Sequence, residues 1–166
     1  MTATIDTGLD SEDRTEVSRE LTKVLADAYA VYLKTHGYHW NVRGPEFFTY
    51  HNLLEQQYRD MWEALDDIAE RIRALGEFAP QGYSTFANLT GIKDGDPEKD
   101  ASEMLRELMR DHETLIATMR GALEVADDDG DDVTVDLLTQ RLGAHEKITR
   151  MLRSTLGGRY HRFSDA

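Results

Sequence analysis

Cysteine is missing from the 166-residue chain, and proline occurs only three times. Without cysteine there is no disulfide framework, thiol nucleophile or thiolate metal site, so any metal must be bound by His, Asp and Glu side chains. That ligand set suits iron, manganese or zinc. The scarcity of proline, together with plentiful Ala, Leu, Glu and Arg, favours helix over sheet.

Long hydrophobic runs and positive charge are also scarce. The longest apolar run, residues 28–33, is far too short for a membrane span, which takes about 20 residues. Residues 1–17 are acidic and lack the basic start and apolar centre of a signal peptide, so we expect a cytoplasmic protein with no membrane partner. The formal net charge of −13 argues against general nucleic-acid affinity and indicates a surface that attracts cations.

Apolar residues recur at helical spacing in four long segments, which predicts helices over residues 11–38, 46–75, 97–126 and 131–156. Ser11 is the expected N-cap of the first helix, whose apolar side should include Leu33, and Gly76 is the expected end of the second. Residues 76–100 are too many for a simple turn, so they should cross the bundle and contain a short helix near residues 84–89.

This pattern predicts an all-α fold, a ferritin-like four-helix bundle with a short extra helix in the long crossover between helices two and three. We expect the bundle to cover residues 11–157, after a flexible acidic N-terminal arm of residues 1–10 and before a C-terminal tail of residues 158–166.

The segment HGYHWNVRGPEFFTYH, residues 36–51, holds three of the chain's six histidines around a helix-breaking Gly-Pro pair. On the helix that follows, at ~100° per residue, four polar side chains fall within an arc of roughly 100°: His51, Glu55, Asp66 and Glu70. Acids on one buried face repel unless a cation or proton lies between them. Such residues are also common on solvated helix faces, so spacing alone leaves both readings open.

Geometry limits where a metal site could be completed. His51 and Asp66 are fifteen residues apart, or roughly 22 Å along a helix axis, so one ion cannot touch both. Ordinary di-iron bundles use Glu-x-x-His motifs on two helices, but the sequence has none, because His112 and His145 stand directly beside glutamates. An intrachain di-iron oxidase is therefore disfavoured, whereas two antiparallel copies of the second helix could unite the two ends. His39 could reach the same place across the turn.

HWNVRGPEFF, then His51, then DDIAERIRALG strongly resembles the Dps family, the miniature ferritins also called DNA-binding proteins from starved cells. The resemblance extends over about residues 21–156. It implies ferroxidase sites that oxidise Fe(II), each with ligands from one subunit and from its two-fold neighbour. The ligands would be His39 and His51 of one subunit with Asp66 and Glu70 of the other, and Glu55 as a nearby carboxylate.

The resemblance further implies a hollow homo-dodecamer that stores ferric mineral and prefers hydrogen peroxide as oxidant, with iron as the bound metal. Trp40 matches a tryptophan beside the first ligand, where it could intercept oxidising equivalents, and His36 has an expected hydrogen-bonding role. Residues 126–136 contain Asp131, an expected helix cap. By resemblance, this segment lines three-fold pores, so Asp131 and Asp136 would lie on the route of iron into the shell.

Two departures from the family pattern matter. Many relatives carry His-Ile-Trp-Met-Leu near the end of the last helix, but here the segment is KITRML, with Arg150 in place of the tryptophan. This puts in doubt the local packing and any radical-quenching role of that position. Lysine-rich arms are also missing, since the first lysine is Lys23. The main hypothesis is an iron-storing enzyme that protects against peroxide. The alternative is a non-enzymatic DNA-binding, nucleoid-compacting shell, which the acidic arm disfavours.

Overall fold

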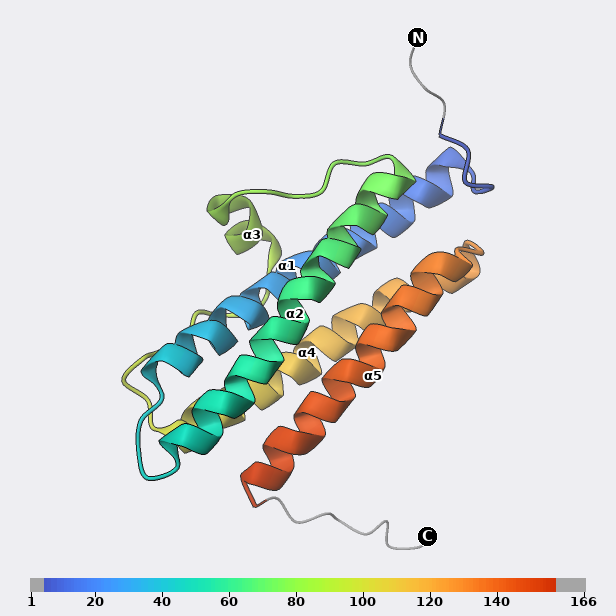
Figure 1. Cartoon of the computed structure of the whole chain (residues 1–166). Coiled ribbons are helices and arrows are strands. Elements are labelled where there is room, and N and C mark those ends of the chain that lie inside the picture. Colours follow the sequence, from blue (N-terminus) through green and yellow to red (C-terminus); the bar gives the residue numbers. More distant parts are fainter. Residues whose placement is uncertain (1–4, 158–166) are drawn as a thin grey trace, which may run out of the picture.

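Four long helices and one short helix make up the bundle in a computed structural model that describes residues 5–157 (Figure 1): α1 Ser11–Asn41, α2 Phe47–Leu75, α3 Tyr83–Leu89, α4 Ala101–Asp128 and α5 Asp132–Thr155. Within this range there is no strand. The predicted all-α bundle with a short helix in the long crossover is therefore confirmed. No helix in the described range is long and apolar enough to span a membrane.

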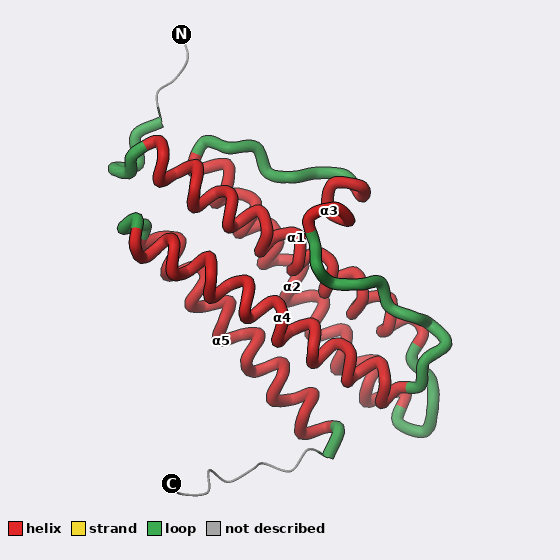
Figure 2. The backbone as a smooth tube through the Cα atoms, turned by 180° about the vertical axis from the view of Figure 1, so that it is seen from behind, coloured by secondary structure: helices red, strands yellow, loops and turns green. Residues whose placement is uncertain are grey.

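The long helices lie side by side, with α1 against α2, α4 against α5, and α1 against α4. Figure 2 shows the crossover between α2 and α4 passing along the outside of the bundle, where α3 packs on α1. The predicted tail of residues 158–166 and the first four residues of the predicted arm lie outside the described residues. The bounds of arm and tail stay predictions.

Local chemistry sets the helix ends. Gly76 ends α2 with φ 108°, a left-handed conformation that favours glycine, as predicted. The N-cap of α1 is Asp10 rather than Ser11, so that prediction was wrong by one residue. Helix α4 begins four residues later than predicted, because Asp100 and Glu103 form a capping box.

The core consists of two apolar clusters. The larger one includes Leu21, Ile68 and Leu115, and the smaller one includes Leu54 and Leu108. Between them lie buried polar residues from all four long helices, among them Thr35, Gln57, His112 and His145. The expectation that Leu33 faces the core was wrong. Its side chain is 47% exposed, since the buried positions of α1 continue through its neighbours on the other side of the helix.

Candidate metal centre

The turn between α1 and α2 brings two predicted ligands together. The rings of His39 and His51 stack with centroids 3.8 Å apart and an interplanar angle of 21°. Each Nδ1 lies 2.9 Å from the other residue's backbone carbonyl oxygen. A carbonyl can only accept, so each Nδ1 carries the proton, and in the neutral ring each Nε2 then keeps a free lone pair. Both imidazoles are thus fixed in the tautomer that binds a metal ion.

A carboxylate lies close to this pair. Glu55 is one turn beyond His51 on α2, and its Oε1 accepts hydrogen bonds from Arg59 Nε at 2.9 Å and Nη2 at 2.7 Å. The bond from Arg59 is the largest influence on the carboxyl and lowers its pKa below the ordinary value, and both histidines act in the same direction. Glu55 is therefore an anion near neutral pH, placed where it can attract a cation toward the two Nε2 atoms.

The other two predicted ligands lie elsewhere on the same helix. Asp66 and Glu70 are exposed on the later half of α2, roughly 22 Å and roughly 28 Å along the axis from His51. Among residues 5–157, no group of three or more His, Asp or Glu side chains converges to hold a metal ion. One subunit therefore brings the histidines together and leaves the carboxylates Asp66 and Glu70 apart from them.

Aromatic side chains surround the histidine pair. His36 stacks on Tyr58 at 4.0 Å between ring centroids, and its centroid is 4.3 Å from that of Trp40. Its Nδ1 lies 3.2 Å from the hydroxyl of Tyr32, which is the kind of hydrogen bond expected for it. Burial lowers the pKa of His36. His36 thus packs against Tyr58 and Trp40 beside the stacked rings of His39 and His51 and is not part of that stack.

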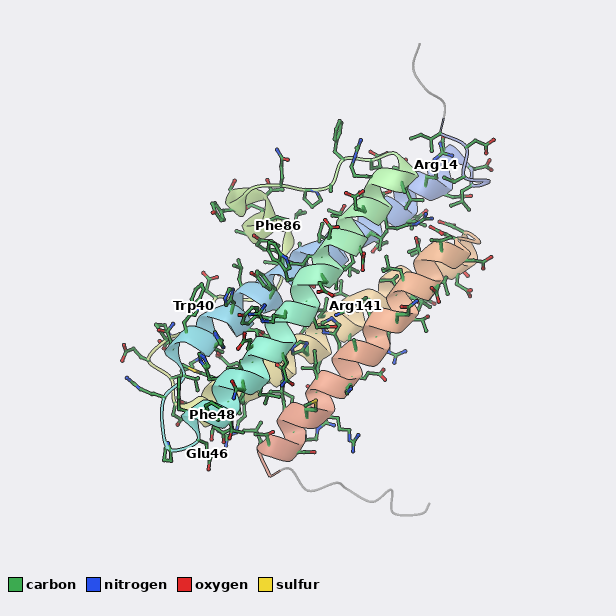
Figure 3. All side chains as sticks on the ribbon, in the orientation of Figure 1. Arg14, Trp40, Glu46, Phe48, Phe86 and Arg141 are labelled. Carbon is green, nitrogen blue, oxygen red and sulfur yellow. The ribbon has the colours of Figure 1, made fainter. Side chains whose placement is uncertain are left out.

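Several large aromatic side chains on α1 and α2 face solvent. Trp40 is 65% exposed, Phe48 75% and Trp62 60%. Figure 3 places Trp40 and Phe48 near the α1–α2 turn. Exposed apolar side chains gathered beside a polar site are typical of a surface that another protein covers. Phe48 was not singled out from the sequence, because spacing does not separate an exposed aromatic residue from a core one.

The two predicted pore aspartates differ in environment. Asp131 is buried and caps α5, accepting from the backbone N–H of Thr134 at 3.0 Å and from Arg71 at 2.7 Å. Burial raises its pKa, but the bonds from Arg71 and Thr134 outweigh this and lower it. Asp136 is exposed and lines a shallow hollow between α2 and α5 together with Glu70. The capping prediction is confirmed, and the role in iron passage stays a prediction.

Comparison with known proteins identifies the family. A model of the ferritin-like domain matches residues 19–158. The DNA protection during starvation protein 2 of Bacillus anthracis is 32% identical over 141 residues, which cover 85% of this chain and 97% of that protein. The chain belongs to the Dps family.

A solved Dps structure has the same fold. The crystal structure of the Dps protein of Vibrio cholerae O1, described as a member of the ferritin-like diiron-carboxylate superfamily, matches with a TM-score of 0.88 at 29% identity. The match covers 94% of this chain and 99% of that one. An uncharacterized low temperature-induced protein of Nostoc is 39% identical over 157 residues, 93% of this chain and 87% of that protein. The turn that carries the histidine pair therefore belongs to the shared Dps fold.

The segment that departs from the Dps pattern packs normally. Ile148 is buried in the smaller apolar cluster, and Thr149 is buried beside it. Arg150 points to solvent. The first two of these positions are therefore filled by buried side chains, and the third faces solvent.

Proposed function

We propose that the chain is the subunit of an iron-oxidising and iron-storing mini-ferritin whose ferroxidase sites are shared between two subunits. The observation that carries this proposal is the His39–His51 pair, which offers two free Nε2 lone pairs, while among residues 5–157 no group of three or more His, Asp or Glu side chains is placed to hold a metal ion. Asp66 and Glu70 of a second copy would complete each site. Oxygen ligands stabilise the Fe(III) product, while imidazole holds Fe(II).

An antiparallel two-fold contact between α2 helices accounts for the exposed aromatic surface. It would cover Trp40, Phe48 and Trp62, which lie on the helices that carry the ligands. Removing apolar side chains from water favours such an association. A two-fold axis also produces two equivalent sites in each dimer, since every contact occurs twice.

In this proposal Fe(II) and hydrogen peroxide are the substrates. Each Fe(II) gives up one electron and peroxide accepts two, so one peroxide oxidises a pair of Fe(II) ions without releasing a hydroxyl radical. Trp40, close to His36 beside the site, would intercept stray oxidising equivalents. The ferric product would collect inside a hollow homo-dodecamer in the cytoplasm, which protects the cell against oxidative stress.

Charge supports iron rather than DNA as the partner. The chain carries a formal charge of −13, and DNA binding relies on clustered Lys and Arg. Asp136 and Glu70 line one hollow, so iron attracted by Asp136 would arrive beside a proposed ligand. Some relatives are named for DNA protection, and this is the observation that favours the alternative, a DNA-binding, nucleoid-compacting shell. A gel shift with no retardation at low salt and neutral pH would favour the iron proposal.

Mixing two defective chains tests the shared site. One chain carries His39→Ala and the other Glu70→Gln, and each alone should lose Fe(II) oxidation. In a mixed dimer one site collects both defects and the other none, so random mixing should restore about a quarter of the sites.

The matched control mixes His39→Ala with His51→Ala. Both changes affect the same half of a shared site, so every site in a mixed dimer keeps one defect and activity should stay lost. Mass spectrometry must show that mixed dimers form in both experiments. If the first mixture contains mixed dimers but recovers no oxidation, the interface site is wrong.

A further inference from the structure

A polar layer crosses the middle of the bundle and has no place in the proposed ferroxidase site. On α4, His112 lies between Leu108 of the smaller apolar cluster and Leu115 of the larger one. On α2, Gln57 lies in the same way between Leu54 and Met61. The flanking residues belong to the same two clusters, so the two polar side chains occupy the same level of the core.

Two histidines from facing helices meet in this layer. The Nδ1 atoms of His112 and His145 lie 2.8 Å apart, and the two side chains are 0% and 1% exposed. Burial lowers the pKa of both imidazoles, so both rings are neutral at physiological pH. Only one proton can lie between the two nitrogens, which makes one ring a donor and the other an acceptor.

Arg141 determines which of the two rings donates the hydrogen bond between the Nδ1 atoms. Its Nη2 lies 3.4 Å from His145 Nε2 and is held by Asp60 at 2.7 Å. Figure 3 places this arginine near the middle of the bundle. A guanidinium can only donate, so His145 Nε2 must accept, and its proton sits on Nδ1. That proton is donated to His112 Nδ1. His112 therefore carries its own proton on Nε2.

The chain of hydrogen bonds thus ends on a donor inside the core. His112 Nε2 is fully buried, and none of the described residues pairs with it. The amide nitrogen and oxygen of Gln57 and the Nε of Arg141 are also buried without partners. These are four of the six such atoms in the described part of the chain. Buried polar groups in folded proteins almost always have hydrogen-bond partners. The concentration of unpaired polar atoms in one layer therefore indicates a bound molecule that supplies the missing hydrogen bonds.

We propose that this layer is a binding site for an internal water molecule, which accepts from His112 Nε2–H and bonds to the amide of Gln57. Water fits because it both accepts and donates, and buried water needs two to four polar partners. A metal ion does not fit. His112 Nε2 carries a proton, and the 2.8 Å between the Nδ1 atoms is a hydrogen-bond distance, shorter than the roughly 3.3 Å that separates two tetrahedral ligands about 2.0–2.1 Å from one ion.

The first test is a high-resolution crystal structure of the assembled protein. The proposal expects density at hydrogen-bond distance from both His112 Nε2 and the Gln57 amide. A direct bond between these two side chains with no density between them would overturn it. So would density at metal-ligand distance with anomalous signal, or no density at all.

The second test reads the tautomers by nitrogen-15 solid-state NMR on the sedimented protein. His145 should be protonated on Nδ1 and His112 on Nε2. Replacing the donor, Arg141→Met, should release His145 into a mixture of tautomers. Arg120→Met is the control, because Arg120 forms an exposed ion pair with Glu146 between α4 and α5, the helices that carry the two histidines, at the same 2.7 Å as the pair of Arg141 and Asp60. The opposite tautomers in the unaltered protein would overturn the proposal, whether or not the Arg141 variant folds.

Discussion

The molecule contains two histidine pairs that differ in what the second nitrogen of each ring can do. In the His39–His51 pair, each Nδ1 donates to a backbone carbonyl, which leaves two lone pairs available. In the His112–His145 pair, the rings bond to each other and to Arg141, which leaves an N–H instead. Both pairs come from neighbouring helices of one bundle. The partner of one ring nitrogen therefore decides whether a histidine pair can bind a metal.

The carboxylates near the two pairs do not follow this division. Glu55, beside the first pair, is bonded to Arg59 at 2.7 Å, and Asp60, beside the second, is bonded to Arg141 at 2.7 Å. The two pairs therefore differ in their ring nitrogens and not in the pairing of the acids beside them. The contrast between an available and an occupied side chain leads to four predictions.

The largest effect is expected from removing the available pair. The double variant His39→Gly with His51→Gly should slow Fe(II) oxidation by at least ~100-fold, because loss of even supporting groups at metal sites costs 10- to 100-fold. Stopped-flow absorbance of the ferric product measures the rate, and size-exclusion chromatography checks assembly. The double variant His112→Leu with His145→Leu is the control and should oxidise iron at the normal rate. Normal rates in the first variant would remove the metal assignment.

Acid should lower the free energy of unfolding through the buried His112–His145 pair, the occupied pair of the two. Burial lowers the pKa of His112 to about 3, whereas the ordinary value is 6.5. Below pH 6.5 the unfolded chain therefore binds a proton on this histidine that the folded chain does not bind. The contribution of the neutral ring to the free energy of unfolding is thus complete above pH 6.5 and falls as the pH drops toward 3. The slope should reach about 1.4 kcal/mol per pH unit for each core histidine. Urea unfolding at fixed subunit concentration should show a shallower loss in the double Leu variant, and an equal slope would contradict the prediction.

Removing one member of the His112–His145 pair should lower the free energy of unfolding by more than the change in side-chain volume alone would. His112→Leu leaves the Nδ1–H of His145 without an acceptor, which costs about 1–3 kcal/mol of unfolding free energy. Replacing both histidines by Leu should cost less than the two single changes added together, because neither partner is then stranded. A double-mutant cycle by urea unfolding gives the coupling. Strict additivity would mean that the two rings do not depend on each other.

The smallest effect concerns the two aspartates. Asp136→Asn removes an exposed charge, so mineral formation at low Fe(II) should slow by about two- to threefold, with unchanged oxidation at high Fe(II). Asp131→Asn should instead lower stability, because it weakens the buried partner of Arg71. Unchanged uptake kinetics in the Asp136 variant would leave no role for it in iron passage.

The sequence predicted the helices and the proximity of His39 and His51 because both depend on local signals. Apolar spacing located four long helices, and Gly76 marked the end of α2 as observed. His39 and His51 meet because a short turn joins their helices, so twelve residues of separation sufficed to predict proximity. Their tautomers could not be predicted, since these depend on which backbone carbonyls the folded turn presents.

Features that depend on long-range packing escaped prediction. His112 and His145 are 33 residues apart. In the sequence they were noted only because they do not form Glu-x-x-His motifs. Their contact follows from the register of α4 against α5, which no local pattern reports. The burial of Asp131 is similar, because Arg71 comes from a different helix. The composite site itself stays a prediction, since it requires a second subunit.

The division of the core into two unequal clusters has a consequence for local stability. The turn with the histidine pair adjoins the smaller cluster, through Tyr38, Val42 and Leu54. With fewer apolar contacts and a polar layer between it and the rest of the core, this end should open more readily than the other. Backbone amides near His51 should therefore exchange their hydrogens faster in an isolated subunit than those near Ile68. Association at the exposed aromatic surface would then stabilise the end of the bundle that carries the proposed metal ligands.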